Sequence, residues 1–191
     1  VYERGVLQKE TFSVETLAGV MRPKLTARDG VVENVTIDMG EPFLHCEQIP
    51  VLGEGLCVER QLTVRGQELR FTSVLTGVPH TVIYVDDPTD PKWMELGREI
   101  ERASVFPRRT NVDFVRVLDD HTVEARTFER GCGPTLACGT GACGTAVASA
   151  LTGRTGRGVD VRLALGTLHI DWAEDNHVYM TGAAELVFDG E

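Results

Sequence analysis

One stretch of small apolar residues constrains the fold of this chain more than any other feature. Residues 140–151 place Cys143, Ala146, Val147 and Ala150 on one stripe at helical spacing, and Gly153 follows where a helix would end. The remaining positions of the stretch are almost as apolar as the stripe. Because a helix that is apolar on every side is buried, we predict a central helix that the rest of the chain surrounds.

Most of the remaining sequence is typical of short strands. Residues 159–165 put Val and Leu on one face and Asp and Arg on the other, which is the alternation of a half-buried strand. Residues 35–39 and 168–172 repeat the pattern. Further strands are predicted at residues 11–16, 19–25, 57–64, 69–76, 81–85, 112–118, 122–128, 178–181 and 185–188.

The elements together predict an α+β fold in which a curled antiparallel sheet or β-barrel wraps around the central helix. A second helix is predicted at residues 91–103, where Trp93, Leu96 and Ile100 share one face and a proline begins the first turn. The chain of 191 residues can hold one large domain or two small ones. The turn at residues 38–42 is a plausible boundary between them.

Charge and composition exclude several classes of partner. The formal net charge of −10 argues against nucleic acid and against an anionic membrane surface, since both require clustered Lys and Arg. No apolar stretch is long enough to cross a bilayer, and the first residues do not resemble a secretory signal. The odd number of cysteines, 5, fits a reducing cytoplasm better than a disulfide scaffold.

The candidate chemistry lies in the glycine-rich segment 129–144, which holds three of the cysteines. Cys138 immediately precedes the central helix, whose free N-terminal amides favour a thiolate or a bound carboxylate. Glu129 and Arg130 supply one charge of each sign. We interpret Cys143 as a core residue and Cys132 more readily as a structural residue in a turn.

Two other kinds of site fit this segment poorly. The spacing Cys-x5-Cys-x4-Cys is not a recognised zinc pattern, and no histidine follows at zinc-finger distance. A phosphate-binding loop would need a closing Gly-Lys-Ser/Thr, which is absent from the glycine run. We therefore predict no metal in this segment.

Residues 129–143 form a motif specific enough to indicate a family: Glu-Arg-Gly-x-Gly-x-Thr-x-Ala-Cys-Gly-Thr-Gly-Ala-Cys. This resembles the second cysteine motif of diaminopimelate epimerases. The resemblance covers essentially the whole chain in the family's order, through residues 38–42, 79–80, 106–114 and 180–184. Two positions depart from the family pattern: Val78 replaces an Asn, which puts one polar substrate contact in doubt, and Pro134 replaces a Glu in a turn.

The resemblance implies a diaminopimelate-epimerase-like fold of two pseudo-symmetric halves, each a β-barrel around a central helix. Residues 38–182 would form the complete second half with Cys138, while residues 1–37 and a last strand at 183–191 would belong to the first half. The family's first cysteine motif, Cys-Gly-Asn-Gly-x-Arg-Cys, has no counterpart here. We therefore expect the chain to begin just downstream of the first catalytic cysteine, and we expect these residues alone to be inactive.

The activity implied by the resemblance is the cofactor-independent interconversion of LL- and meso-2,6-diaminopimelate, for lysine and peptidoglycan precursors. Cys138 would be one of two thiols that act as acid and base on opposite faces of the substrate's Cα. The backbone amides of Gly139 and Thr140 would hold the α-carboxylate. The resemblance further implies a cytoplasmic enzyme that binds a small-molecule substrate, requires no cofactor and can form homodimers.

The remaining roles concern the far end of the substrate. By resemblance, Asn111 and Arg130 bind the distal carboxylate and ammonium. Glu129 would contact an ammonium and, with His80, help to set the pKa values of the two thiols. Taken singly, these residues would be interpreted as a capped histidine, a turn asparagine and a solvated ion pair, and only their combined spacing favours a site.

Two alternative functions remain open. A proline racemase would share the fold, but its Asp-Arg-x-Pro-Cys-Gly-Thr-Gly pattern does not match the Glu-Arg-Gly stretch here. A non-catalytic ligand-binding domain of the same fold would explain why only one of the two cysteine motifs is present.

Overall fold

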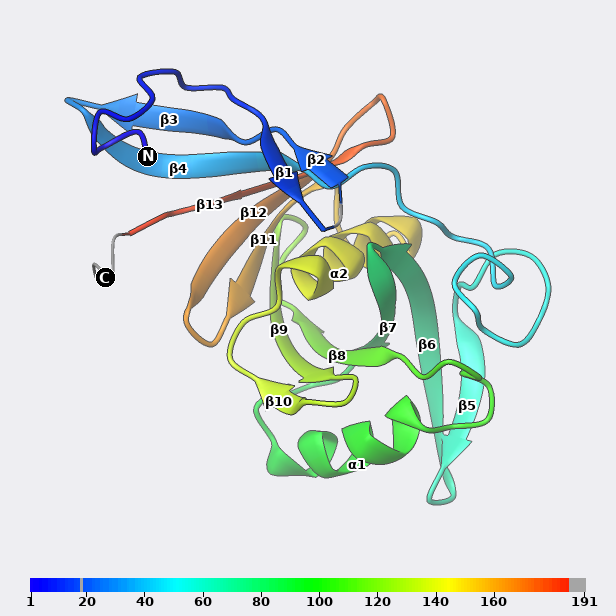
Figure 1. The fold of residues 1–191 in the computed structure, drawn as a ribbon. Coiled ribbons are helices and arrows are strands. Elements are labelled where there is room, and N and C mark those ends of the chain that lie inside the picture. The colour runs from blue at the N-terminus through cyan, green and yellow to red at the C-terminus, as the bar shows by residue number, and fades with distance from the viewer. Residues whose placement is uncertain (18, 186–191) are drawn as a thin grey trace.

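The central helix is present and enclosed. The computed structural model of the chain describes residues 1–17 and 19–185. Helix α2 (Gly139–Leu151) begins after Cys138 and ends at Thr152, and residues 141–149 are all buried. Figure 1 shows the strands curling around this helix. The predicted fold class is therefore confirmed. The small side chains of α2 explain how the sheet can approach the helix from several sides.

One curled sheet contains nearly all the strands. Its neighbours follow the order β3-β4-β13-β12-β11-β9-β8-β7-β6-β5, β10 pairs with β9, and β1 and β2 form a separate hairpin. The bounds are β1 Val14–Thr16, β2 Gly19–Met21, β3 Lys24–Arg28, β4 Val31–Asp38, β5 Arg60–Val64, β6 Gln67–Thr76, β7 Val78–Tyr84, β8 Asn111–Val117, β9 Thr122–Glu129, β10 Gly133–Thr135, β11 Gly158–Leu163, β12 Gly166–Trp172 and β13 Val178–Gly182.

Two neighbouring pairs are parallel, whereas the sequence predicted an antiparallel sheet. Strand β7 runs parallel to β8, and β9 runs parallel to β11. A helix lies in the connection of each pair, α1 (Pro91–Glu101) in the first and α2 in the second. Parallel neighbours require such a crossover, so the two helices explain both departures. The alternation of side chains gives the exposed face of a strand but not its direction.

Several strands differ from the prediction. The stretch 19–25 divides into β2 and β3 because Pro23, between them, lacks the N–H of a ladder bond and restricts Arg22. Strand β10 was not predicted, since its Gly-Pro-Thr sequence reads as a turn. Of the strand predicted at residues 185–188, only Glu185 lies among the described residues, and it is not in a strand.

The sheet separates two cores, and strand β8 contributes to both. Val112 and Phe114 point toward α1, whereas Asp113 and Val115 occupy the alternate positions that face α2. Phe114 stacks on Trp93 of α1, with ring centroids 5.4 Å apart. The core around α2 consists mainly of small and β-branched side chains, among them Ala142, Cys143, Ala146, Val147, Val123 and Val161. Helix α1 and the sheet therefore form the outer layer around the α2 site.

The N-terminal strands join the sheet at one end. Strand β4 pairs with β13, so the sheet continues from residues 24–38 into the part that surrounds α2. The turn predicted at residues 38–42 follows β4, and Gly40 adopts a φ of 79° there. The division into two halves at this turn stays a prediction. Within the described part of the chain, no helix combines the length and apolarity needed to span a membrane.

Candidate active site

Cys138 caps the amino end of the buried helix. Its backbone is extended (φ −141°, ψ 108°), and its Sγ accepts a hydrogen bond from the N–H of Gly141 at 3.3 Å. The thiol is unpaired and half-buried, and its Sγ lies 3.5 Å from the hydroxyl oxygen of Thr140. The sulfur therefore faces the free amides and the positive end of the helix dipole, which is where negative charge is stabilised.

A buried histidine–aspartate pair lies beside this helix end. His80 of β7 and Asp113 of β8 are both fully buried, with His80 Nδ1 at 2.7 Å from Asp113 Oδ2. The other ring nitrogen, Nε2, lies 3.0 Å from the Thr140 hydroxyl. Burial lowers the pKa of His80, but the Asp113 carboxylate and the neighbouring Cys138 raise it more, to about 9. His80 is therefore neither solvated nor a simple cap.

Two glycines let the helix pack directly on this pair. A Cβ at Gly141 would lie 2.7 Å from Asp113 Oδ1, and a Cβ at Gly144 would lie 2.9 Å from the Cβ of His80. Contacts that short are not tolerated, so any larger residue would move the helix away from the sheet. The Gly-x-x-Gly spacing thus sets the distance between the helix end and the two charged side chains.

The other predicted residues surround the turn that leads into β10. Asn111 accepts a hydrogen bond from the N–H of Arg130 at 2.8 Å and donates to the Pro79 carbonyl at 3.0 Å. The Arg130 guanidinium donates to the Arg108 carbonyl at 2.9 Å. Glu129 accepts from the Thr135 hydroxyl at 2.8 Å. No ion pair between Glu129 and Arg130 is present among the described side chains, so the interpretation that the two residues would have if taken singly, a solvated ion pair, does not hold.

Two acidic residues lie at this site that were not predicted from the sequence. Asp113 partners His80, and the signal was a lone acid within the Val- and Phe-rich strand β8. Glu101, at the end of α1, is buried and accepts from the N–H of Gly131 at 3.1 Å, with Arg109 at 3.6 Å. Glu101 therefore anchors the turn after Arg130. Its position at a helix end gave no signal in the sequence.

The remaining cysteines are outside this arrangement. Cys143 is fully buried, and burial, with Cys138 nearby, raises its pKa to about 12, which confirms a core role. Cys57 is buried beside Cys46, and burial together with that neighbour raises its pKa to about 12. Cys132 is exposed. In residues 1–17 and 19–185, no three His, Cys, Asp or Glu side chains form a group that could hold a metal ion.

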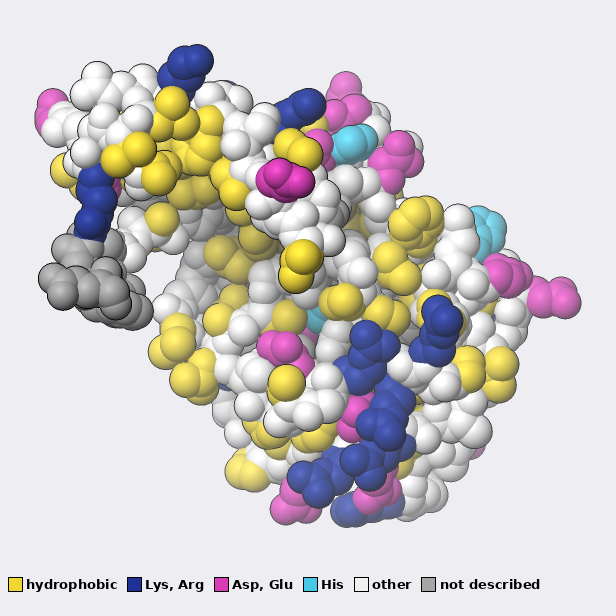
Figure 2. Space-filling model, viewed as in Figure 1, with side chains coloured by type: hydrophobic (Ala, Val, Ile, Leu, Met, Phe, Trp, Pro, Cys, Tyr) yellow, Lys and Arg dark blue, Asp and Glu magenta, His cyan; other side chains and the backbone are white. Residues whose placement is uncertain are grey.

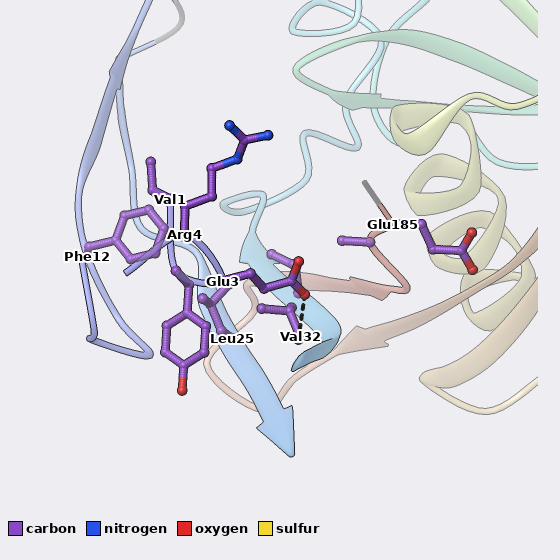
Figure 3. A pocket seen from close by; sticks show the side chains of 10 residues that line it. Val1, Glu3, Arg4, Phe12, Leu25, Val32 and Glu185 are labelled. Carbon is purple, nitrogen blue, oxygen red and sulfur yellow. Dashed lines mark hydrogen bonds between the residues drawn. The ribbon is translucent and has the colours of Figure 1, made fainter. Parts of the chain in front are cut away.

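A separate groove of about 470 Å³ lies beside the N-terminal segment. Phe12, Leu25 and Val32 line it with apolar groups, and Glu3 accepts a hydrogen bond from the N–H of Val32 at 2.8 Å (Figure 3). None of the residues predicted for the active site lines this groove. It belongs to the N-terminal strands and not to the helix end that carries Cys138.

Solved structures share the fold of this chain. The fold matches a hydroxyproline epimerase from Agrobacterium vitis with bound trans-4-hydroxy-L-proline, at a TM-score of 0.65 and 21% identity over 95% of this chain and 60% of that one. It also matches a probable proline racemase from Agrobacterium radiobacter, at a TM-score of 0.68 and 16% identity over 98% and 64%. The chain thus shares the fold of these two structures, and it spans less than two thirds of either one.

Sequence relatives identify the family. The family model for diaminopimelate epimerase matches residues 72–187. The diaminopimelate epimerase of Moorella thermoacetica is 49% identical over 193 residues, and that of Heliobacterium modesticaldum is 50% identical over 194 residues. Each alignment covers 100% of this chain and 69% of the relative. The chain belongs to the diaminopimelate epimerase family, whose members are isomerases.

Proposed function

We propose that the protein interconverts LL- and meso-2,6-diaminopimelate, without a cofactor, in lysine and peptidoglycan precursor synthesis. The observation that carries the proposal is the Cys138 thiol at the amino end of the buried helix α2. Family membership supports the choice of substrate, since the relatives with which this chain aligns along its full length are named diaminopimelate epimerases. The alternative function, a proline racemase, is supported only by structures of 21% identity or less.

The chemistry requires a proton to leave one face of Cα and to return on the other. The Cα–H is a weak acid, so a thiolate must act as base while a thiol on the opposite face acts as acid. Cys138 takes one of these roles, and the roles exchange with the direction of reaction. The amides at the start of α2, including those of Gly139 and Thr140, stabilise the charge that develops on the α-carboxylate.

The turn beyond β9 supplies the groups for the distal end of the substrate. Arg130 uses one guanidinium N–H on the Arg108 carbonyl, and its other N–H groups suit a carboxylate. Glu129 uses one oxygen on Thr135, and the other suits an ammonium. Asn111 fixes this turn to the sheet, and by the family resemblance it binds the same end of the substrate. His80 and Glu129 adjust the protonation of the thiols.

The second thiol of the mechanism is not identified in this chain. Cys46, Cys57 and Cys143 are buried, and no stretch matches the family's first cysteine motif. We therefore infer that these 191 residues alone do not turn over diaminopimelate. The five unpaired cysteines agree with a cytoplasmic location. The family resemblance also allows a homodimer, which sedimentation velocity would test.

The test uses two proteins: the 191-residue chain, and a chimaera that joins this chain to the part of the Moorella thermoacetica relative that it does not cover. Deuterium exchange at Cα in D2O, followed by stereochemical analysis, is expected only in the chimaera. Cys138→Ala in the chimaera should abolish turnover from both stereoisomers, whereas Cys132→Ala should not. Turnover by the 191 residues alone would contradict the inferred inactivity, and unchanged turnover in Cys138→Ala would contradict the role of this thiol.

A further inference from the structure

The Asp113 carboxylate has no part in the function proposed above, although it is buried beside the site. We propose that Asp113 is a positioning residue, which holds the His80 ring so that its Nε2–H points at Thr140 and Cys138. The thiol chemistry of Cys138 thus gains a fixed positive neighbour. The inference rests on the proposed function in naming Cys138 as the reacting thiol, but its test does not require turnover.

The geometry around Asp113 leaves its carboxylate one orientation. Oδ1 accepts a hydrogen bond from the Thr127 hydroxyl of β9 at 2.7 Å, and Oδ2 lies 2.7 Å from His80 Nδ1. A carboxylate only accepts hydrogen bonds, so Nδ1 of His80 carries a proton. His80, Asp113 and Thr127 lie on the adjacent strands β7, β8 and β9. Gly141 of α2 packs against the Asp113 carboxylate.

The second ring nitrogen of His80 then faces the helix end. Nε2 lies 3.0 Å from Thr140 Oγ1, which itself lies 3.5 Å from Cys138 Sγ. Asn111 Nδ2 is farther from Nε2, at 3.4 Å, and already donates to the Pro79 carbonyl at 3.0 Å. A proton on Nε2 therefore has the Thr140 oxygen and the sulfur as its acceptors.

The electrostatics agree with a protonated ring. The titratable groups that act on His80 are Asp113 from β8 and Cys138 from the start of α2. Although burial lowers the pKa of His80, these two groups raise it to about 9, so the ring is an imidazolium at neutral pH. Without Asp113, a buried imidazolium would lack its counter-charge and the ring would lose a proton.

The deciding variant is Asp113→Asn, which keeps the size of the side chain and removes the charge. The ¹⁵N resonances of the His80 ring report its protonation state directly. In the unmodified protein both ring nitrogens are expected to stay protonated at pH 7, and in the variant one proton should be lost. The rate at which iodoacetamide alkylates Cys138, followed by peptide mass spectrometry, should fall roughly tenfold at pH 7 and recover at higher pH.

The surface of the same protein offers a matched control. His169 Nδ1 also lies 2.7 Å from Asp160 Oδ1, but both side chains are exposed. Asp160→Asn should therefore leave the His80 resonances and the alkylation of Cys138 unchanged. Thr127→Val, which removes the second bond to Asp113 but keeps its charge, should shift both measurements in the same direction and by less. It also provides the test if Asp113→Asn does not fold.

Three outcomes overturn the inference. The His80 ring could prove neutral at pH 7 in the unmodified protein, or Asp113→Asn could change stability alone while both measurements stay constant. The third is an equal effect of Asp160→Asn. The inference and the proposed function fail separately, because ring protonation and alkylation are measured without diaminopimelate. If the chimaera is inactive but the ¹⁵N resonances and the alkylation rate change as expected, only the proposed function is contradicted.

Discussion

The layers around α2 and the N-terminal strands belong to one sheet, yet they differ in how their apolar side chains are used. Around α2 and α1, the strands bury Phe71, Phe114, Val115 and Ile170 almost completely. In residues 1–17 and 19–37, Leu25 is the only large apolar side chain that is buried. Figure 2 shows hydrophobic side chains gathered on the surface over these N-terminal strands. The α2 region therefore carries the stability of the described chain.

The comparison also explains where the candidate chemistry lies. A buried carboxylate and imidazolium need a rigid, close-packed environment, because any loosening would expose them to water or leave them unpaired. The layers around α2 offer that environment. The N-terminal strands present an open apolar groove instead, in which the Glu3 carboxylate accepts one hydrogen bond from the backbone N–H of Val32.

The largest difference between the regions is expected for a pair of phenylalanines. Phe114 is fully buried and stacks on Trp93, so Phe114→Ala should lower the free energy of unfolding by about 4 kcal/mol. Phe12 lines the N-terminal groove and remains partly exposed, so Phe12→Ala should lower it by about 1 kcal/mol or less. Urea denaturation followed by tryptophan fluorescence measures both, and equal losses would remove the distinction between the regions.

The second expected effect is a pH dependence of stability that originates beside α2. The pKa of His80 is about 9 in the folded protein, above its ordinary value of 6.5, because Asp113 and Cys138 outweigh the effect of burial. The pair therefore stabilises the fold fully below about pH 6.5, and this contribution is lost as the pH rises through 9. The loss should be on the order of 3 kcal/mol.

Denaturant midpoints between pH 6 and pH 10 measure this dependence. Asp113→Asn should flatten the profile, whereas Asp160→Asn, in the exposed pair with His169, should leave its shape unchanged. A profile of the unmodified protein that stays level from pH 6.5 to pH 9.5 would show that His80 is not charged in the folded state.

The sequence predicted the centre of the molecule better than its connections. The apolar stretch 140–151 identified α2, and side-chain alternation located most strands, since both patterns follow from burial. Strand direction was missed because it depends on the crossover helices, and β10 was missed because Gly133 and Pro134 are turn residues.

The site was predicted in part for a similar reason. Cys138 was placed at the amino end of α2, as the structure has it, because the motif and the helix are contiguous in the sequence. Asp113 and Glu101 were missed because their partners, His80 and Gly131, lie far away along the chain. A lone acid in an apolar strand marks Asp113 as unusual, but the local sequence does not identify its partner. Glu101 carries no such mark, because an acid at the end of a helix is common on a surface.

A pair of glycines sharpens the comparison at the helix itself. A Cβ at Gly144 would lie 2.9 Å from the Cβ of His80, so Gly144→Val should lower the free energy of unfolding by about 2 kcal/mol. At Gly158, in β11, nothing lies within 4 Å of an added Cβ, and Gly158→Val should change it by less than about 0.5 kcal/mol. Thermal unfolding compares the two, and similar losses would show that α2 can move away from the sheet.

The smallest effect is expected at the tip of the N-terminal hairpin. Leu17 lies between β1 and β2 and is 111% exposed relative to a reference residue, so its side chain gains nothing from folding. Leu17→Ser should therefore change the free energy of unfolding by less than about 0.5 kcal/mol, while lowering self-association at high protein concentration. Urea denaturation and light scattering measure the two quantities. A loss of stability above about 1 kcal/mol would mean that the hairpin is packed in solution, and the contrast between the two regions would then no longer hold.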